Sequence, residues 1–213
     1  MEPVVQRASQ PRPAMALRGE RLEYFTIAWN CLEGLIGVGA GILSGSISLV
    51  GFGIDSFIEV TSGAALLWRM SLDADEVRRE RSEVLALRTV GVCFLGLAAY
   101  VSFEGLSSLV RHEASKRSFA GIALAVASLL VMPFLARAKH KVGWHLASAA
   151  MTADAKQTEF CAYLSAILLA GLLLNAGFGL WWADPAAALV MSPIIAKEGV
   201  DALRGKACCD HCG

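Results

Sequence analysis

The sequence has few charged residues for its length. Only 18% of its 213 residues are Asp, Glu, Lys or Arg, whereas 55% are hydrophobic and the mean hydropathy is +0.53. This composition excludes an ordinary soluble domain and indicates a polytopic membrane protein embedded in a lipid bilayer. The 19 basic and 19 acidic residues give a net charge of zero, and no basic stripe is present. A nucleic-acid partner is therefore excluded, because proteins that bind nucleic acids carry clustered positive charge.

Histidine is also scarce, which argues against an intramembrane enzyme. The four histidines lie outside the long apolar runs or near their ends. A redox or hydrolytic site built on Cys161 and Asp154 would therefore lack a histidine base within the membrane. We do not expect an enzyme.

Six apolar runs are long enough, or nearly so, to cross a bilayer as helices, since a helix needs about 20 residues to span the hydrocarbon core. They cover residues 22–43, 46–68, 89–110, 118–136, 146–174 and 183–203. The chain is therefore predicted to be all-α, with six transmembrane helices in one domain over residues 20–206. Residues 1–19 contain three prolines and no apolar signal segment, which predicts a disordered tail, and residues 207–213 form a second tail.

Lys and Arg gather on one side of the predicted bundle. Most lie in the two tails and in the second and fourth loops, and the fourth loop carries Arg137, Lys139 and Lys141. On the opposite side, basic residues occur only in the third loop, and they are Arg111, Lys116 and Arg117. Because positively charged loops stay in the cytoplasm, both termini are expected to be cytoplasmic. The expected location is a bacterial inner membrane, with several passes.

Two carboxylates, Asp55 and Glu59, lie in the middle of the second apolar run. An ionised side chain at the centre of a membrane helix costs about 2.5 to 3.5 kcal/mol, so two of them offset much of what the apolar neighbours contribute. Intramembrane acids are therefore candidates for a functional site. Their spacing of four residues places both on one face of the helix.

The fifth run carries a matching polar face. Asp154, Gln157 and Cys161 share one side of a helix, and the helical rise places them level with Asp55 and Glu59. If the two helices face each other, carboxylates, a carboxamide and a thiol meet near mid-membrane. This set suits a divalent cation, and the thiol shifts the preference from Mg or Ca toward Zn, Cd, Co or Fe(II). The alternative is that the acids are protonated or pair with Lys156, and only fasten the helices together.

These segments resemble a known family. GIDSFIE at residues 53–59 looks like the D-S-x-x-D signature of the cation diffusion facilitator family, which is the cation efflux family. ADAKQTEFC at residues 153–161 is similar to its A-D-x-x-H-x-x-x-D stretch. The six-helix plan, Asn30 and Glu33 in the first run, FE at residues 103–104 and WAD at residues 182–184 extend the likeness over about residues 20 to 206.

The resemblance implies a homodimeric exporter that moves a divalent metal ion out of the cytoplasm, with alternating access and in exchange for protons. Zinc is the expected cargo, with Co, Cd, Fe(II) and Mn as alternatives, and no permanently bound cofactor is expected. The implied ligands are Asp55, Glu59, Gln157 and Cys161. Asp154 is added as a further ligand or proton site. Gln157 and Cys161 differ from the histidine and aspartate of the family pattern, which weakens one ligand and softens the other.

The C-terminal residues carry a second set of potential ligands. The chain is expected to be a short form of the family, without the cytoplasmic domain that commonly follows the sixth helix. Its last residues include three thiols and an imidazole, which suit a soft or borderline metal. The residues are Cys208, Cys209, His211 and Cys212. Metal delivery or sensing is the hypothesis for this tail, and an exposed tail without a role is the alternative. For the whole chain, the alternative to a transporter is a membrane metal receptor or regulator.

Overall fold

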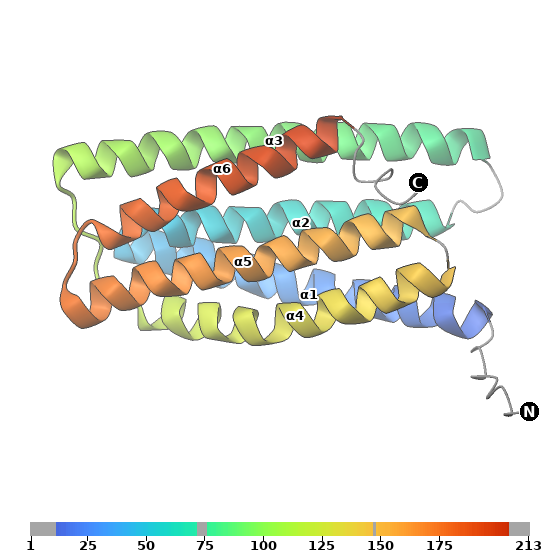
Figure 1. Cartoon of the computed structure of the whole chain (residues 1–213), viewed down its shortest axis with the longest axis horizontal. Coiled ribbons are helices and arrows are strands. Elements are labelled where there is room, and N and C mark those ends of the chain that lie inside the picture. Colours follow the sequence, from blue (N-terminus) through green and yellow to red (C-terminus); the bar gives the residue numbers. More distant parts are fainter. Residues whose placement is uncertain (1–11, 72–75, 147, 205–213) are drawn as a thin grey trace, which may run out of the picture.

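The computed structural model describes residues 12–71, 76–146 and 148–204, and within these ranges the chain forms six helices and no strand (Figure 1). The helices are α1 (Arg12–Ser44), α2 (Ile47–Ser71), α3 (Glu76–Arg111), α4 (Phe119–Leu146), α5 (Ala149–Phe178) and α6 (Ala183–Leu203). The predicted all-α fold with six helices is confirmed.

The six helices run up and down in one bundle, with α2 at its centre (Figure 1). α2 packs against α1, α3, α5 and α6, while α4 packs against α1 and α5, and α6 lies against α3 and α5. The end at which α1 begins and toward which α6 ends is called the termini end below. A residue of α2 that faces inward is therefore within reach of α5 and α6.

Five of the helices, α1 to α5, are long and apolar enough to cross a membrane. α6 has 21 residues and carries Asp184, Lys197, Glu198 and Asp201, but it packs along the same bundle. Many large hydrophobic side chains cover the outside of the bundle, where lipid replaces water as the solvent. Examples are Tyr24, Leu35, Phe103, Phe134 and Phe178. The chain is a multi-pass membrane protein.

The N-terminal helix begins within the predicted tail. Residues 12–19 belong to α1, so the prediction of a disordered segment over residues 1–19 is wrong for this part. Pro13 is tolerated because it lies in the first turn, and the segment AMAL that follows consists of good helix formers. Met15 is buried in a small apolar cluster with Val142 and Met151, which anchors the start of α1 to α4 and α5. Residues 1–11 lie outside the described residues.

Helix α4 extends ten residues past its predicted end at Ala136 and reaches Leu146. Arg137, Lys139 and Lys141 therefore lie on a helix and not in the fourth loop. Lys139 is fully buried, so it is not one of the loop charges that indicate the orientation of the chain in the membrane. The prediction was wrong because a lysine suggests a loop, whereas here carboxylates of α1 and α5 compensate its charge inside the bundle.

Glycines set a close contact between α1 and α2. A Cβ on Gly53 would lie 2.6 Å from the backbone nitrogen of Val38, and one on Gly37 would lie 2.9 Å from the Cα of Gly53. Such small residues allow two membrane helices to approach backbone to backbone. This contact fixes the position of α2 two residues before Asp55.

Asp184 ties the start of α6 to the start of α2. Its carboxylate accepts hydrogen bonds from the hydroxyl of Ser46 at 2.6 Å, from the hydroxyl of Ser48 and from the backbone N–H of Ile47 at 3.0 Å. A buried carboxylate with three donors is satisfied, and it also caps the N-terminus of α2. Asp184, one of the residues that carried the family resemblance, thus has a structural role.

Candidate functional site

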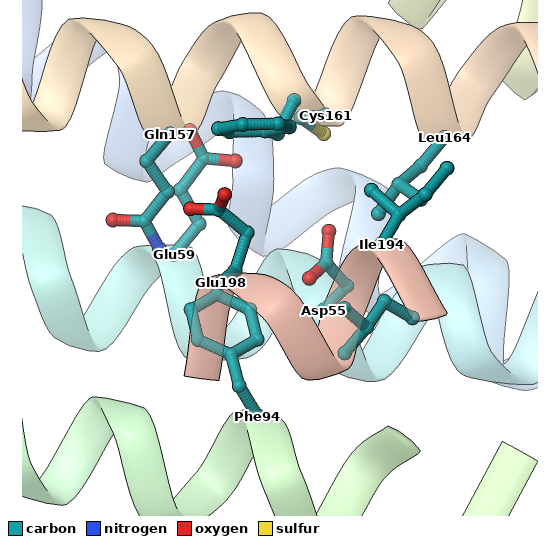
Figure 2. A pocket seen from close by; sticks show the side chains of 10 residues that line it. Asp55, Glu59, Phe94, Gln157, Cys161, Leu164, Ile194 and Glu198 are labelled. Carbon is teal, nitrogen blue, oxygen red and sulfur yellow. The ribbon is translucent and has the colours of Figure 1, made fainter. Parts of the chain in front are cut away.

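A pocket between α2, α3, α5 and α6 brings four of the predicted ligands together. Asp55 and Glu59 enter it from α2, and Gln157 and Cys161 enter it from α5 (Figure 2). Each pair is spaced four residues apart, so both members lie on the inner face of their helix. The other lining residues are Phe94, Phe160, Leu164, Ile194, Ile195 and Glu198. The expectation that α2 and α5 face each other through these residues agrees with the structure.

The two α2 carboxylates are buried without full compensation. Asp55 is 5% exposed and Glu59 is 3% exposed. Oε1 of Glu59 accepts a hydrogen bond of 2.9 Å from the hydroxyl of Thr158, but Oε2 is buried without a partner among the described residues. Leaving a buried polar atom unpaired costs about 1–3 kcal/mol, and more for a charged group. Such an atom is explained where a ligand completes its coordination.

The carboxamide of Gln157 has the same property. Its Nε2 atom is buried, and no described residue accepts a hydrogen bond from it. Because the oxygen and nitrogen of an amide exchange places by a rotation of the end group, Gln157 can present an oxygen lone pair to the pocket instead. Two of the four predicted ligands therefore carry unsatisfied polar atoms.

The described residues do not form a closed coordination sphere. Within the described ranges, no three His, Cys, Asp or Glu side chains converge closely enough to hold a metal ion. The pocket thus supplies candidate ligands on two helices without gathering them around one point. Binding an ion there requires side-chain rotation or a small approach of α5 toward α2.

Glu198 of α6 is a further acid of the pocket, and the sequence analysis did not include it. Figure 2 shows its side chain extending from α6 into the space between the two ligand pairs. The residue is half-buried, and Ile194, one turn earlier, lines the same pocket. In the sequence, the spacing of four residues indicates only that Ile194 and Glu198 share a face of the helix. It does not indicate that this face of α6 turns toward the inside of the bundle.

Asp154 does not line the pocket, because it faces the buried Lys139. The two side chains form a salt bridge, and Nζ of Lys139 also lies 3.2 Å from Oε2 of Glu23 and 3.3 Å from Oγ1 of Thr158. Thr158 connects this group to the pocket through its hydrogen bond to Glu59. The sequence analysis did not predict that Glu23 and Lys139 are buried beside the site, because each lies near the end of a predicted transmembrane helix, where charged residues usually contact water.

The remaining predicted residues divide into two groups. Cys208, Cys209, His211 and Cys212 lie outside the described residues. In α1, Glu33 accepts hydrogen bonds from the indole N–H of Trp29 at 2.6 Å and from Ser56 at 3.5 Å. Asn30 is fully buried, and neither polar atom of its amide has a partner among the described residues.

Comparison with known proteins gives two findings. A family model described as the cation efflux transmembrane domain matches residues 25–206. An uncharacterized transporter of Methanocaldococcus jannaschii is 26% identical over 182 residues, which is 83% of this chain. The alignment covers 64% of that relative, so the chain spans less than two thirds of its length. The matched range contains every pocket residue named above.

Proposed function

The chain belongs to the cation efflux family, and from this premise we propose that it is a metal cation transporter, which exports a divalent transition-metal ion in exchange for protons. Zinc is the first candidate for the cargo. The observation that carries the proposal is the pocket in which α2 and α5 each present two potential ligands, two of them with unsatisfied atoms. As in the sequence-based expectation, the assembly is a homodimer and the termini end faces the cytoplasm.

The donor set selects the class of metal. Asp55 and Glu59 supply hard oxygen ligands, whereas Cys161 supplies a sulfur ligand that Mg and Ca do not favour. Zn accepts oxygen, nitrogen and sulfur ligands in a flexible four-coordinate arrangement. The set therefore favours Zn, Cd, Co or Fe(II) over Mg and Ca, with Mn less favoured because it prefers oxygen alone.

Coupling to protons follows from competition for the same atoms. A carboxylate or thiol must be deprotonated to bind a metal ion, so metal binding releases protons and proton binding releases metal. After α2 and α5 have moved so that the pocket opens to the outer side of the membrane, reprotonation of Asp55 and Glu59 releases the ion there. Asp154 serves this proposal as the partner of Lys139 and not as a direct ligand.

The test is metal-driven proton movement in proteoliposomes that contain a pH-sensitive dye. Zn, Cd, Co, Fe(II) and Mn are compared in the wild-type chain, in Asp55→Asn and in the control Glu113→Gln. Glu113 is an exposed acid in the α3–α4 connection, where it pairs with the exposed Arg111 at 3.8 Å. We expect flux with one or two metals, no flux in Asp55→Asn and normal flux in Glu113→Gln. Metal binding without any flux would instead support a receptor.

A further inference from the structure

A second charged group lies beside the pocket and is not used by the proposed transport cycle. It consists of Glu23 from α1, Lys139 from α4, and Asp154 and Thr158 from α5, and is called the Lys139 cluster below. Glu23, Lys139 and Thr158 are fully buried, and Asp154 is 5% exposed. Lys139 lies seven residues before the end of α4, which places it about 10 Å inside the termini end of that helix.

The cluster contains more oxygen atoms than the lysine can satisfy. The three N–H donors of Lys139 are taken up by Glu23 Oε2, Asp154 Oδ2 and Thr158 Oγ1. Oε1 of Glu23 and Oδ1 of Asp154 remain buried, and no described residue donates to them. Five oxygen atoms with a formal charge of −2 therefore surround one ammonium group, and the cluster as a whole has a formal charge of −1.

Two carboxyl groups and a hydroxyl around a buried point form a set of oxygen ligands that suits a hard divalent cation. An ammonium is a compact point charge, so it can stand where such an ion would bind. Because the lysine is covalently attached, it occupies this position permanently. A free metal ion does not displace it while its three hydrogen bonds hold.

We propose that the Lys139 cluster is a second cation site, which the chain fills with its own lysine and thereby closes to metal ions. Lys139 keeps Asp154 out of metal coordination and confines the cargo to the pocket of Asp55 and Glu59. Without the lysine head group, Glu23, Asp154 and Thr158 bind one divalent ion that prefers oxygen ligands. The confinement of the cargo to the pocket rests on the proposed function, whereas the second cation site does not.

The test counts metal ions per chain with Mn²⁺ as the probe, because Mn²⁺ prefers oxygen ligands over the thiols of the chain. Equilibrium dialysis of purified full-length protein is compared between wild type and Lys139→Ala. We expect Lys139→Ala to bind one more Mn²⁺ than wild type. The control Lys139→Ala/Asp154→Asn loses that additional ion, since a carboxylate is missing. An unchanged count in Lys139→Ala overturns the proposal, as does an extra ion that persists in the control.

Thermal unfolding gives a second readout in case Lys139→Ala folds poorly. Mn²⁺ at about tenfold above its Kd is expected to raise the unfolding midpoint of Lys139→Ala by about 4 °C more than that of wild type. The neutral variant Glu23→Gln/Lys139→Met/Asp154→Asn removes all three charges together, so it folds without the ion and shows no such rise. If Lys139→Ala cannot be isolated even with Mn²⁺ present while the neutral variant can, the site does not bind the ion and the proposal fails.

These results also separate the two proposals. A wild-type chain that binds no metal in the pocket contradicts the proposed function, yet an extra ion in Lys139→Ala still supports the second site. Conversely, wild-type flux that is blocked by Asp55→Asn stands even if the count in Lys139→Ala does not change.

Discussion

At the scale of single residues, Asp55 stands where function and stability oppose each other. A buried acid at the centre of a membrane bundle destabilises the apo protein, and only its ligand offsets this cost. We expect Asp55→Asn to raise the unfolding midpoint in detergent while weakening zinc binding about 10–100-fold, as loss of one charged ligand contact implies. Calorimetric titration and thermal unfolding of the same sample check both halves.

The control for this substitution is Glu113→Gln, which removes an acid at the bundle surface. It should leave the affinity unchanged and shift the midpoint little, because exposed ion pairs contribute about 1 kcal/mol or less. If Asp55→Asn bound zinc as tightly as the wild-type chain, Asp55 would not be a ligand.

Cys161 is expected to set the metal preference. It is buried in the pocket next to two carboxylates, and sulfur favours Zn and Cd over Mn. Cys161→Asp should therefore lower the affinity ratio of Cd to Mn by about tenfold or more, while Cys161→Ser weakens binding of both metals. Competition between Cd and Mn in the titration cell measures this ratio. An unchanged ratio in both variants would place Cys161 among the apolar packing residues.

Glu198 allows a test of whether an acid in the pocket wall promotes metal binding. Its carboxylate extends into the space between the ligand pairs, so Glu198→Gln removes a negative charge that attracts the incoming ion. We expect the half-saturating metal concentration for flux to rise about 3–10-fold, with a larger effect at low salt. Asp201→Asn is the matched control, because Asp201 lies on the same helix outside the pocket lining. Equal effects of the two variants would mean that the net charge of α6 matters and not the position of Glu198.

At the scale of helices, the contact between α1 and α2 determines where the ligands of α2 lie. Gly53→Ala places a methyl group 2.6 Å from the backbone of Val38, where no flexible side chain can yield. The helices must separate, and such overpacking costs about 1–3 kcal/mol. We expect a lower unfolding midpoint together with weaker metal binding, since Asp55 shifts with its helix.

Gly39→Ala provides the control on the other helix of the pair. A Cβ at Gly39 meets nothing within 4 Å, so this change should be neutral or slightly stabilising because alanine favours helices. The same midpoint for both variants would show that the α1–α2 contact yields to an added methyl group.

The helices also show which parts of the site the sequence could predict. The spacing of Asp55 with Glu59, and of Gln157 with Cys161, fixes which residues share a face, and apolar length fixes the spans. The inward faces of α4 and α6 depend on long-range packing that no local pattern records. The sequence therefore placed Lys139 in a loop and did not indicate Glu198 as a site residue, although Lys139 is buried and Glu198 lines the pocket.

At the scale of the whole molecule, transport requires that metal and protons use the same groups alternately. If metal displaces protons from Asp55, Glu59 and Cys161, lowering the pH on the metal side must weaken metal binding, because protonation and ligation exclude each other. We expect the half-saturating zinc concentration for flux to rise about tenfold per pH unit for each displaced proton between about pH 8 and 6. Initial flux rates at several external pH values, with the inner pH held fixed, measure this slope.

Because Asp55→Asn should carry no flux, its pH slope is measured on zinc binding by calorimetric titration, where it should be shallower than in the wild-type chain since one titrating ligand is gone. The slope should stay unchanged in Glu113→Gln. If the half-saturating zinc concentration did not depend on pH, the transported protons would not bind to the metal ligands of the pocket. The Lys139 cluster is joined to the pocket residue Glu59 through Thr158. Proton coupling that survives without the pocket ligands would therefore have to be sought in that cluster, and Glu23→Gln and Asp154→Asn would then change the slope that Asp55→Asn leaves intact.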